Sequence, residues 1–249
     1  MSMFCFFTLK ERDDAEDDSN AGTEVITSDK LSFAESAKLL FKNPYVFIST
    51  FAFMMLSVLN NLSAVANYYF RFVVGDISLA SIASLVSVLG IALIAVMPVI
   101  QRKIGCRGTF VFGMLILALG HMAKLLMPVN VLWLAACSAL TTGGQVLTGS
   151  TRTIVNIDCM NYGQRQTGVQ LEGLYSCVNG FGDKVGLGLG SFLLGFIMDI
   201  AGFDGQLAVQ SASAITSIKL LYTAFPAVVA IIGVAIMLFY NEKIVKGEN

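Results

Sequence analysis

Long apolar runs, separated by short polar segments, dominate the pattern along this chain. A helix that crosses the roughly 30 Å hydrocarbon core of a bilayer needs about 20 mostly apolar residues, and about six runs approach or exceed that length. They cover residues 44–72, 79–100, 108–127, 131–155, 173–198 and 220–240. These runs do not alternate between apolar and polar residues, which disfavours a membrane-spanning strand barrel. The pattern therefore predicts an all-α, polytopic membrane protein with about six transmembrane helices.

The composition supports a lipid environment. The chain of 249 residues is 55% hydrophobic and 13% charged, with a mean hydropathy of +0.73, whereas roughly a quarter of the residues of a soluble domain are charged. The net charge of −1 gives no indication of a nucleic-acid partner. The five cysteines form no disulfide framework or CxxC metal pair. We therefore expect neither a bound metal nor another cofactor.

Basic residues predict the orientation in the membrane. Of the 16 Lys and Arg residues, 12 lie before the first span or after the second, fourth and sixth spans. These are Lys10, Arg12, Lys30, Lys38, Lys42, Arg102, Lys103, Arg107, Arg152, Arg165, Lys243 and Lys246. By the positive-inside rule, both termini of this multi-pass protein of the cell membrane are expected in the cytoplasm.

The ends of the chain differ from its centre. Residues 11–29 are acidic and poor in large apolar residues, which is typical of a mobile linker. Ser32 and Glu35 have capping-box spacing and predict a short interfacial helix that ends before Pro44. We therefore expect a cytoplasmic segment over residues 1–43, a six-helix bundle over residues 44–240 and a cytoplasmic tail over residues 241–249.

Polar residues recur within the first predicted span. At about 100° per residue, Asn60, Asn67 and Arg71 lie within roughly 20° of one line, and Tyr68 follows Asn67. A polar stripe on a spanning helix is expected to face protein or water. It is either one wall of a hydrated pathway or a set of interhelical hydrogen bonds, and Arg71 also suits an anchor at the outer interface.

The fifth span contains a sharper polar pattern. Glu172, Ser176, Asn179 and Asp183 lie within about 40° of one line, and Lys184 points about 100° away from Asp183. A charge at the centre of a spanning helix costs about 2.5–3.5 kcal/mol on insertion scales. We therefore expect both charges to face water, substrate or charges on other helices. A structural ion pair with another helix remains the alternative.

The remaining polar residues do not indicate an enzyme. There is no HExxH motif, and the single histidine, His121, has no acid beside it on its helix. His121 and Lys124 are interpreted as interfacial anchors near the outer end of the third span, in preference to a proton relay. The TTGGQ segment, residues 141–145, is expected to allow the fourth span to bend.

The stretch IDCMNYGQRQTGVQLEGLYSCVNGFGDKVGLGLG, residues 157–190, resembles the signature of the glycoside-pentoside-hexuronide:cation symporters. These are the melibiose-carrier-like branch of the major facilitator superfamily. Matching positions are Asp158, Tyr162, Gly163, Thr167, Gly168, Glu172, Gly173, Tyr175, Ser176, Asn179, Phe181, Lys184 and Gly186. The stretches NYYFRFVVGD, RKIGCRG and FFTLKER also resemble parts of this family. The resemblance covers nearly the whole chain but only helices seven to twelve of the family's twelve.

This resemblance implies roles for particular residues. In the family, a lysine on the eleventh helix faces the central cavity near the sugar and coupling-cation sites, and Lys184 occupies that position. Asp183 replaces a family asparagine and is either a local modulator of Lys184 or a partner for another helix. Five further departures remove much of the charge network of the cytoplasmic loop: Asn161, Gln164, Arg165, Gln166 and Gln170.

The resemblance implies the C-terminal half of a sugar:cation symporter that works by alternating access and is coupled to H⁺ or Na⁺. The expected partners are a small sugar, the coupling cation, the bilayer and an N-terminal transporter half. Because the family's principal cation-binding carboxylates lie in its first six helices, transport by this chain alone is doubtful. The chain would be a split-gene product, a truncated reading frame or a fragment. The alternative is a non-transporting membrane scaffold or remnant that uses the same bundle.

Overall fold

A computed structural model of the chain describes residues 26–27, 32–207 and 209–247. The described residues are almost entirely helical, and a two-residue parallel pairing joins β1 (Ile26–Thr27) to β2 (Val169–Gln170). Most of the predicted acidic linker, together with Lys10, Arg12, Lys30 and FFTLKER, lies outside the described residues. The prediction of an all-α membrane protein is confirmed.

The predicted interfacial helix is α2 (Phe33–Phe41). The Ser32 backbone N–H donates to the Glu35 carboxylate at 3.0 Å as part of the predicted capping box. The helix ends before Asn43, whose side chain caps α3 (Pro44–Leu62) by accepting from the Tyr45 backbone N–H. Proline at the first helical position has no N–H to leave unsatisfied, which favours a helix start at Pro44.

The first span continues beyond α3. A short break leads into α4 (Val65–Tyr69), and a π-helical turn, η2 (Phe70–Val74), ends the span. Gly75 then adopts a positive φ of 92°. Together these elements form an apolar run of 31 residues, which is slightly longer than the predicted span.

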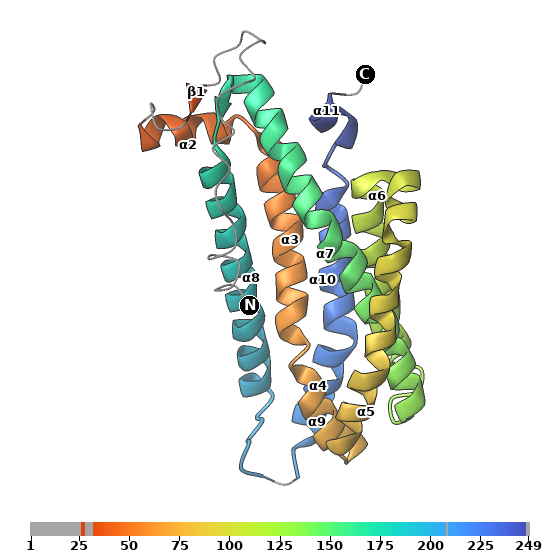
Figure 1. Cartoon of the computed structure of the whole chain (residues 1–249). Helices are drawn as coiled ribbons and strands as arrows, with labels where there is room; N and C mark the ends of the chain where they lie inside the picture. The colour runs from red at the N-terminus through yellow and green to blue at the C-terminus, as the bar shows by residue number, and fades with distance from the viewer. Residues whose placement is uncertain (1–25, 28–31, 208, 248–249) are drawn as a thin grey trace, which may run out of the picture.

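The second and third spans form one helical hairpin. The first leg consists of α5 (Ser78–Ser87), the 3₁₀ turn η3 (Val88–Ala92) and the start of α6 (Leu93–Ala123). Gly105 interrupts α6 with a φ of 73°, which glycine adopts without steric cost. Figure 1 shows the two legs side by side. The described residues contain five runs that are long and apolar enough to cross a membrane. One of these runs is the hairpin, whose two legs would each cross once, so the five runs agree with the prediction of about six spans.

The last three spans are longer than predicted or begin earlier. The fourth is α7 (Val131–Thr167), and the fifth is α8 (Glu172–Ile200). The sixth begins with α9 (Ala212–Tyr222), breaks at Thr223 and continues as α10 (Ala224–Met237). A short helix, α11 (Glu242–Lys246), follows. The Gly105 turn, the α7–α8 connection and α11 lie at one end of the bundle (Figure 1), which we call the motif end.

Glycines allow the helices to approach closely. On α8, a Cβ atom at Gly186 would lie 2.6 Å from the carbonyl oxygen of Met54, and one at Gly190 would lie 2.8 Å from the Asn61 Cβ. Gly182 meets Thr50 in the same way. Small residues at such contacts let backbones pack tightly where lipid provides no hydrophobic driving force. We call this α3–α8 contact the glycine seam.

A second close contact involves the TTGGQ segment. Residues 141–145 are helical throughout within α7. A Cβ at Gly144 would lie 2.7 Å from the carbonyl oxygen of Gly113 on α6, and one at Gly113 would lie 2.5 Å from the Thr148 hydroxyl. These glycines therefore serve close packing between α6 and α7.

The glycine seam predicts a contrast between two neighbouring glycines. Gly186→Ala should destabilise the protein by about 1–3 kcal/mol, because an added methyl group overpacks the contact. Gly188→Ala should be neutral or slightly stabilising, because nothing lies within 4 Å of that position and alanine favours helix. Thermal unfolding of both purified variants in detergent would measure the difference. Equal midpoints would contradict the packing role of Gly186.

Candidate functional site

Two of the polar residues predicted on the fifth span face α3. The Thr50 hydroxyl donates to Asn179 Oδ1 at 3.0 Å, and the Ser57 hydroxyl donates to Asp183 Oδ1 at 2.7 Å. Asn179 is buried, whereas Ser176 and Glu172 are exposed and lie nearer the motif end. The predicted stripe is therefore divided between a helix contact and an exposed surface.

Asp183 forms an ion pair with another helix. Its Oδ2 lies 2.5 Å from an Arg152 guanidinium nitrogen, and both side chains are somewhat more than one-quarter exposed. The Arg152 guanidinium also lies 5.4 Å from the centroid of the Phe53 ring. The sequence analysis grouped Arg152 with the basic residues that follow the fourth span, but α7 continues for 15 residues beyond it. The ion-pair alternative for Asp183 is therefore the arrangement in the structure.

Lys184 lies on the other side of α8. Its side chain is exposed, and within the described part of the chain it forms no ion pair. Gly180 and Gly188, one turn before and after it, have no atoms within 4 Å of a built Cβ. The predicted divergence of the two charges is thus observed: Asp183 is held inside the bundle, and Lys184 projects from an exposed face of α8.

The four residues of the first span that were predicted to form a polar stripe do not converge on this ion pair. Tyr68 packs edge-on against the Phe203 ring, with the centroids 5.5 Å apart. The Arg71 guanidinium lies 5.0 Å from the centroid of the Phe72 ring. Asn60 and Asn67 are exposed, and only Asn67 of these four lines the cavity at the opposite end of the bundle, described below.

The signature loop builds a compact contact at the motif end. The side-chain amide of Asn43 donates to the Cys159 carbonyl oxygen at 2.8 Å and to the Tyr175 hydroxyl at 2.9 Å. Gly163 lies so close to this hydroxyl that a Cβ would collide with it. This contact joins the starts of α3 and α8 to the end of α7.

The other signature residues shape the same end. Thr167 donates from its hydroxyl to the Gly163 carbonyl oxygen at 2.8 Å, and Gly168 ends α7 with a φ of 70°. The Tyr162 ring packs edge-on against Tyr45. Asp158 is half-buried on α7. The geometry of these residues indicates a positioning role for the loop motif.

A second contact at the motif end involves α11. The Glu242 carboxylate accepts from the backbone N–H groups of Cys106 and Arg107, at 2.9 Å each, directly after the Gly105 turn. Lys246 donates to the same carboxylate at 2.6 Å. Arg107 and Arg165 donate to backbone carbonyl oxygens around α11, at 2.6 Å to Leu238 and Lys246. We call this arrangement the C-terminal clasp.

Sequence reasoning missed the C-terminal clasp. The sequence around Glu242 contains no pattern that predicts its contact with Cys106 and Arg107. Asn241, which caps α11 by accepting from the Ile244 N–H, was the available signal for a helix there.

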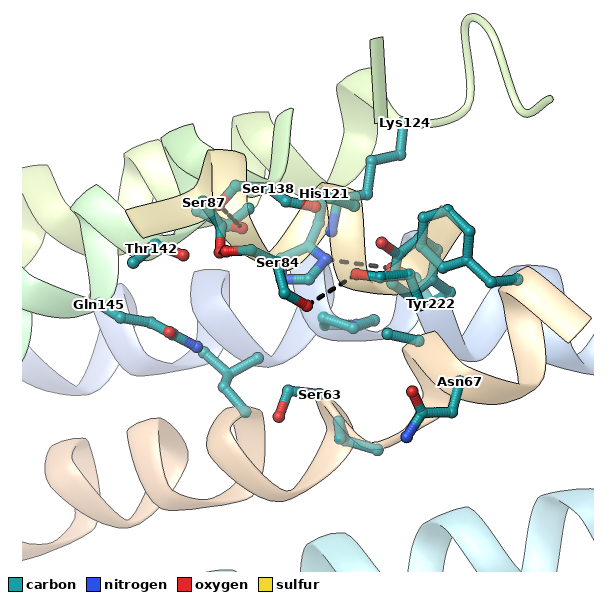
Figure 2. Close-up of a pocket in the computed structure, with 18 residues that line it drawn as sticks. Ser63, Asn67, Ser84, Ser87, His121, Lys124, Ser138, Thr142, Gln145 and Tyr222 are labelled. Carbon is teal, nitrogen blue, oxygen red and sulfur yellow. Dashed lines mark hydrogen bonds between the residues drawn. The ribbon is translucent and has the colours of Figure 1, made fainter. Parts of the chain in front are cut away.

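A polar cavity of about 270 Å³ lies between α3–α4, α5, α6, α7 and the α9–α10 break. It is at the end of the bundle opposite the motif end, and Figure 2 shows its polar lining. Lys124 reaches into it and is only 3% exposed. His121 Nδ1 lies 3.1 Å from the Tyr222 carbonyl oxygen. The interpretation of Lys124 as an interfacial anchor is therefore wrong, because its side chain is buried.

Within the described residues, no three His, Cys, Asp or Glu side chains are grouped to hold a metal ion. The polar side chains described above are mainly hydroxyls and amides, and the charged side chains among them lie on separate faces of the bundle. Such groups can offer a polar ligand hydrogen bonds and an isolated charge.

Comparison with known proteins gives a consistent result. A family model described as "MFS/sugar transport protein" matches residues 1–242. The isoprimeverose transporter of Lactiplantibacillus pentosus is 28% identical over 83% of this chain and 43% of its own length. The raffinose carrier protein of Pediococcus pentosaceus is 30% identical over 86% of this chain and 35% of its own length. The glucuronide carrier protein homolog of Escherichia coli (strain K12) is 28% identical over 78% and 41%. The chain thus spans about half the length, or less, of these curated relatives.

The C-terminal clasp predicts a pH-dependent stability. Burial alone would raise the pKa of Glu242, but the hydrogen bonds from Lys246, Cys106 and Arg107 outweigh it and hold this pKa below its ordinary value of 4.5. The ionised carboxylate therefore stabilises the folded state above pH 4.5, and this contribution is lost as the pH falls through the lowered pKa.

Glu242→Gln should therefore lower the free energy of unfolding by about 1–2 kcal/mol at pH 7. The difference from the unmodified protein should shrink below pH 4.5. Thermal unfolding at both pH values would measure it, with Lys243→Gln on the exposed side of α11 as the control. If Glu242→Gln changed the stability equally at both pH values, the ionised carboxylate would not be the source of the stabilisation.

Proposed function

Because the chain belongs to the MFS/sugar transport protein family, we propose that it forms helices seven to twelve of a sugar:cation symporter and requires an N-terminal half for transport. As a member of a transporter family, the chain is not an enzyme, and the family implies sugar-like substrates. The observation that carries the proposal is Lys184, a charged side chain without an ion-pair partner among the described residues, on the open face of α8.

An exposed charge on a spanning helix needs a polar surrounding. Facing lipid, Lys184 would carry the insertion penalty of a charge at mid-membrane. Facing a second helical half, it would lie in a hydrated space between the two halves. In secondary transporters, substrate and coupling ion bind near the midplane at such an interface. An ammonium group donates up to three hydrogen bonds, which suits the hydroxyl groups of a sugar.

The internal contacts of α8 support this arrangement. The glycine seam and the Asp183–Arg152 pair join α8 to α3 and α7, so these helices can rock as one unit. Alternating access requires that one half move against the other around a shared site. Sugar and cation would bias the two access states through their different affinities for them. The coupling ion, H⁺ or Na⁺, is part of this proposal.

The proposed orientation places the motif end in the cytoplasm. Arg102, Lys103, Arg107 and Arg165 lie there with α11, in agreement with the positive-inside rule. A tag placed after Asn249 should then be inaccessible to a membrane-impermeant label in intact cells. Labelling from the outside would reverse the orientation.

A non-transporting scaffold is the second candidate. Its support is the open face of α8 around Lys184. In this case the open face of α8 would bind another membrane protein without a sugar pathway. Co-expression with a family N-terminal half distinguishes the two, because only the transporter proposal expects sugar uptake to appear.

We predict that Lys184→Ala weakens sugar-dependent uptake by at least about tenfold in vesicles that contain both halves. Loss of one hydrogen bond from a charged donor accounts for that factor. Asp183→Asn should be milder, because an amide oxygen can still accept from Ser57 and Arg152. Radiolabelled glycoside and pentoside uptake would measure both variants, with the chain alone as the baseline. Normal uptake by a well-inserted Lys184→Ala variant would refute the pathway role.

A further inference from the structure

The cavity opposite the motif end is built around a buried cation. Lys124 is only 3% exposed, and within the described residues its ammonium group forms neither an ion pair nor a hydrogen bond. Nζ lies over the face of the Tyr222 ring, 4.2 Å from its centroid. A cation–π contact compensates only part of the cost of removing an ammonium group from water. Among the described residues, the charge therefore has no carboxylate counter-ion.

The cavity supplies no counter-ion of its own. Its 18 lining residues include no aspartate or glutamate. They do include many small polar groups, which Figure 2 shows spread over the lining of the cavity. These are Ser63, Asn67, Ser84, Ser87, His121, Ser138, Thr141, Thr142, Gln145 and Tyr222. The lining thus combines one positive charge with neutral hydrogen-bonding groups.

Several of these groups remain available to a ligand. The hydroxyls of Ser84, Ser87 and Thr141 donate to carbonyl oxygens of their own helices, which leaves oxygen lone pairs as acceptors. The side-chain amides of Asn67 and Gln145 make no hydrogen bond within the described residues. Each can donate two. Donors, acceptors and a cation are therefore present together.

We propose that this cavity is a binding site for a small hydroxylated anion whose carboxylate or sulfonate pairs with Lys124. The carboxylate would take the place of the missing counter-ion, and the amides and hydroxyls would bind the ligand's hydroxyl groups. Ligand pockets usually begin at about 300 Å³, so a cavity of about 270 Å³ suits a ligand of monosaccharide size or smaller. No residue of α8 lines it, so the site is separate from Lys184.

The single tryptophan of the chain provides a direct probe. The Trp133 indole N–H donates to the carbonyl oxygen of Ala123 at 2.8 Å, one residue before Lys124. Fluorescence of the purified full chain in detergent can therefore be followed during titration at constant sodium chloride. The two probes are D-glucuronate and D-glucose, which share a sugar ring and differ in the carboxylate. This measurement requires no transport, so it is independent of the proposed function.

D-Glucuronate should produce a saturable fluorescence change and raise the thermal unfolding midpoint, whereas D-glucose should bind at least about tenfold more weakly. Lys124→Met should weaken D-glucuronate binding by at least about tenfold, because it removes a charged hydrogen-bond donor. Lys219→Met on α9, outside the cavity lining, is the matched control and should leave binding unchanged. If Lys124→Met does not fold, Gln145→Leu should still weaken binding by several-fold.

Three results would overturn the proposal. One is equal binding of D-glucuronate and D-glucose, and another is unchanged D-glucuronate affinity in a folded Lys124→Met variant. The third is loss of D-glucuronate binding once a family N-terminal half is assembled with the chain. That loss would show that a carboxylate of the protein, and not a free ligand, pairs with Lys124.

Discussion

Close approach of helix backbones is the constraint on which this structure depends. Lipid tails are as apolar as leucine side chains, so burial of apolar surface does not by itself hold spanning helices together. Dispersion contacts and interhelical hydrogen bonds must do so, and both require short distances between helix axes. Gly186 and Gly190 provide this for α8, and Gly113 and Gly144 provide it for α6 and α7. The hydrogen bonds from Thr50 and Ser57 to α8 exist because the glycine seam brings these helices together.

The same seam separates two neighbouring charges. A helix packed along one glycine face has its opposite face turned away from the bundle. Asp183 lies at the edge of the packed face and reaches Arg152, whereas Lys184 is carried past that edge. The open face therefore carries a cation next to exposed apolar side chains such as Phe181. Any second half that packs there meets the positive charge of Lys184.

The sequence was informative about properties that act within one helix. Hydropathy predicted the spans, Ser32 and Glu35 predicted the α2 capping box, and the helical period separated Asp183 from Lys184. It was less informative about where helices end beyond the membrane. Arg152 was grouped with the residues that follow the fourth span because the apolar run stops near it, although α7 continues to Thr167.

Contacts between distant segments could not be predicted in this way. Asn43 and Tyr175 are 132 residues apart, and Cys106 and Glu242 are 136 apart. Lys124 is a long, charged side chain near the end of a span, as an interfacial anchor would be. Only the packing of Tyr222 and the neighbouring helices shows that it is buried. Arg165, which departs from the family pattern, donates to α11. The loop that has fewer charged residues than the family pattern therefore makes a hydrogen bond to α11 through Arg165.

The break between α9 and α10 also determines the chemistry of His121. A carbonyl oxygen can only accept a hydrogen bond, so the contact with the Tyr222 carbonyl oxygen requires the proton to reside on Nδ1. In the neutral ring, Nε2 then carries a lone pair and is a hydrogen-bond acceptor. A bare halide ion has no proton to offer such a group, whereas an anion that also bears a hydroxyl group does. The helix break therefore fixes a tautomer that leaves Nε2 as an acceptor, and in the site proposed above this acceptor would suit a ligand hydroxyl group.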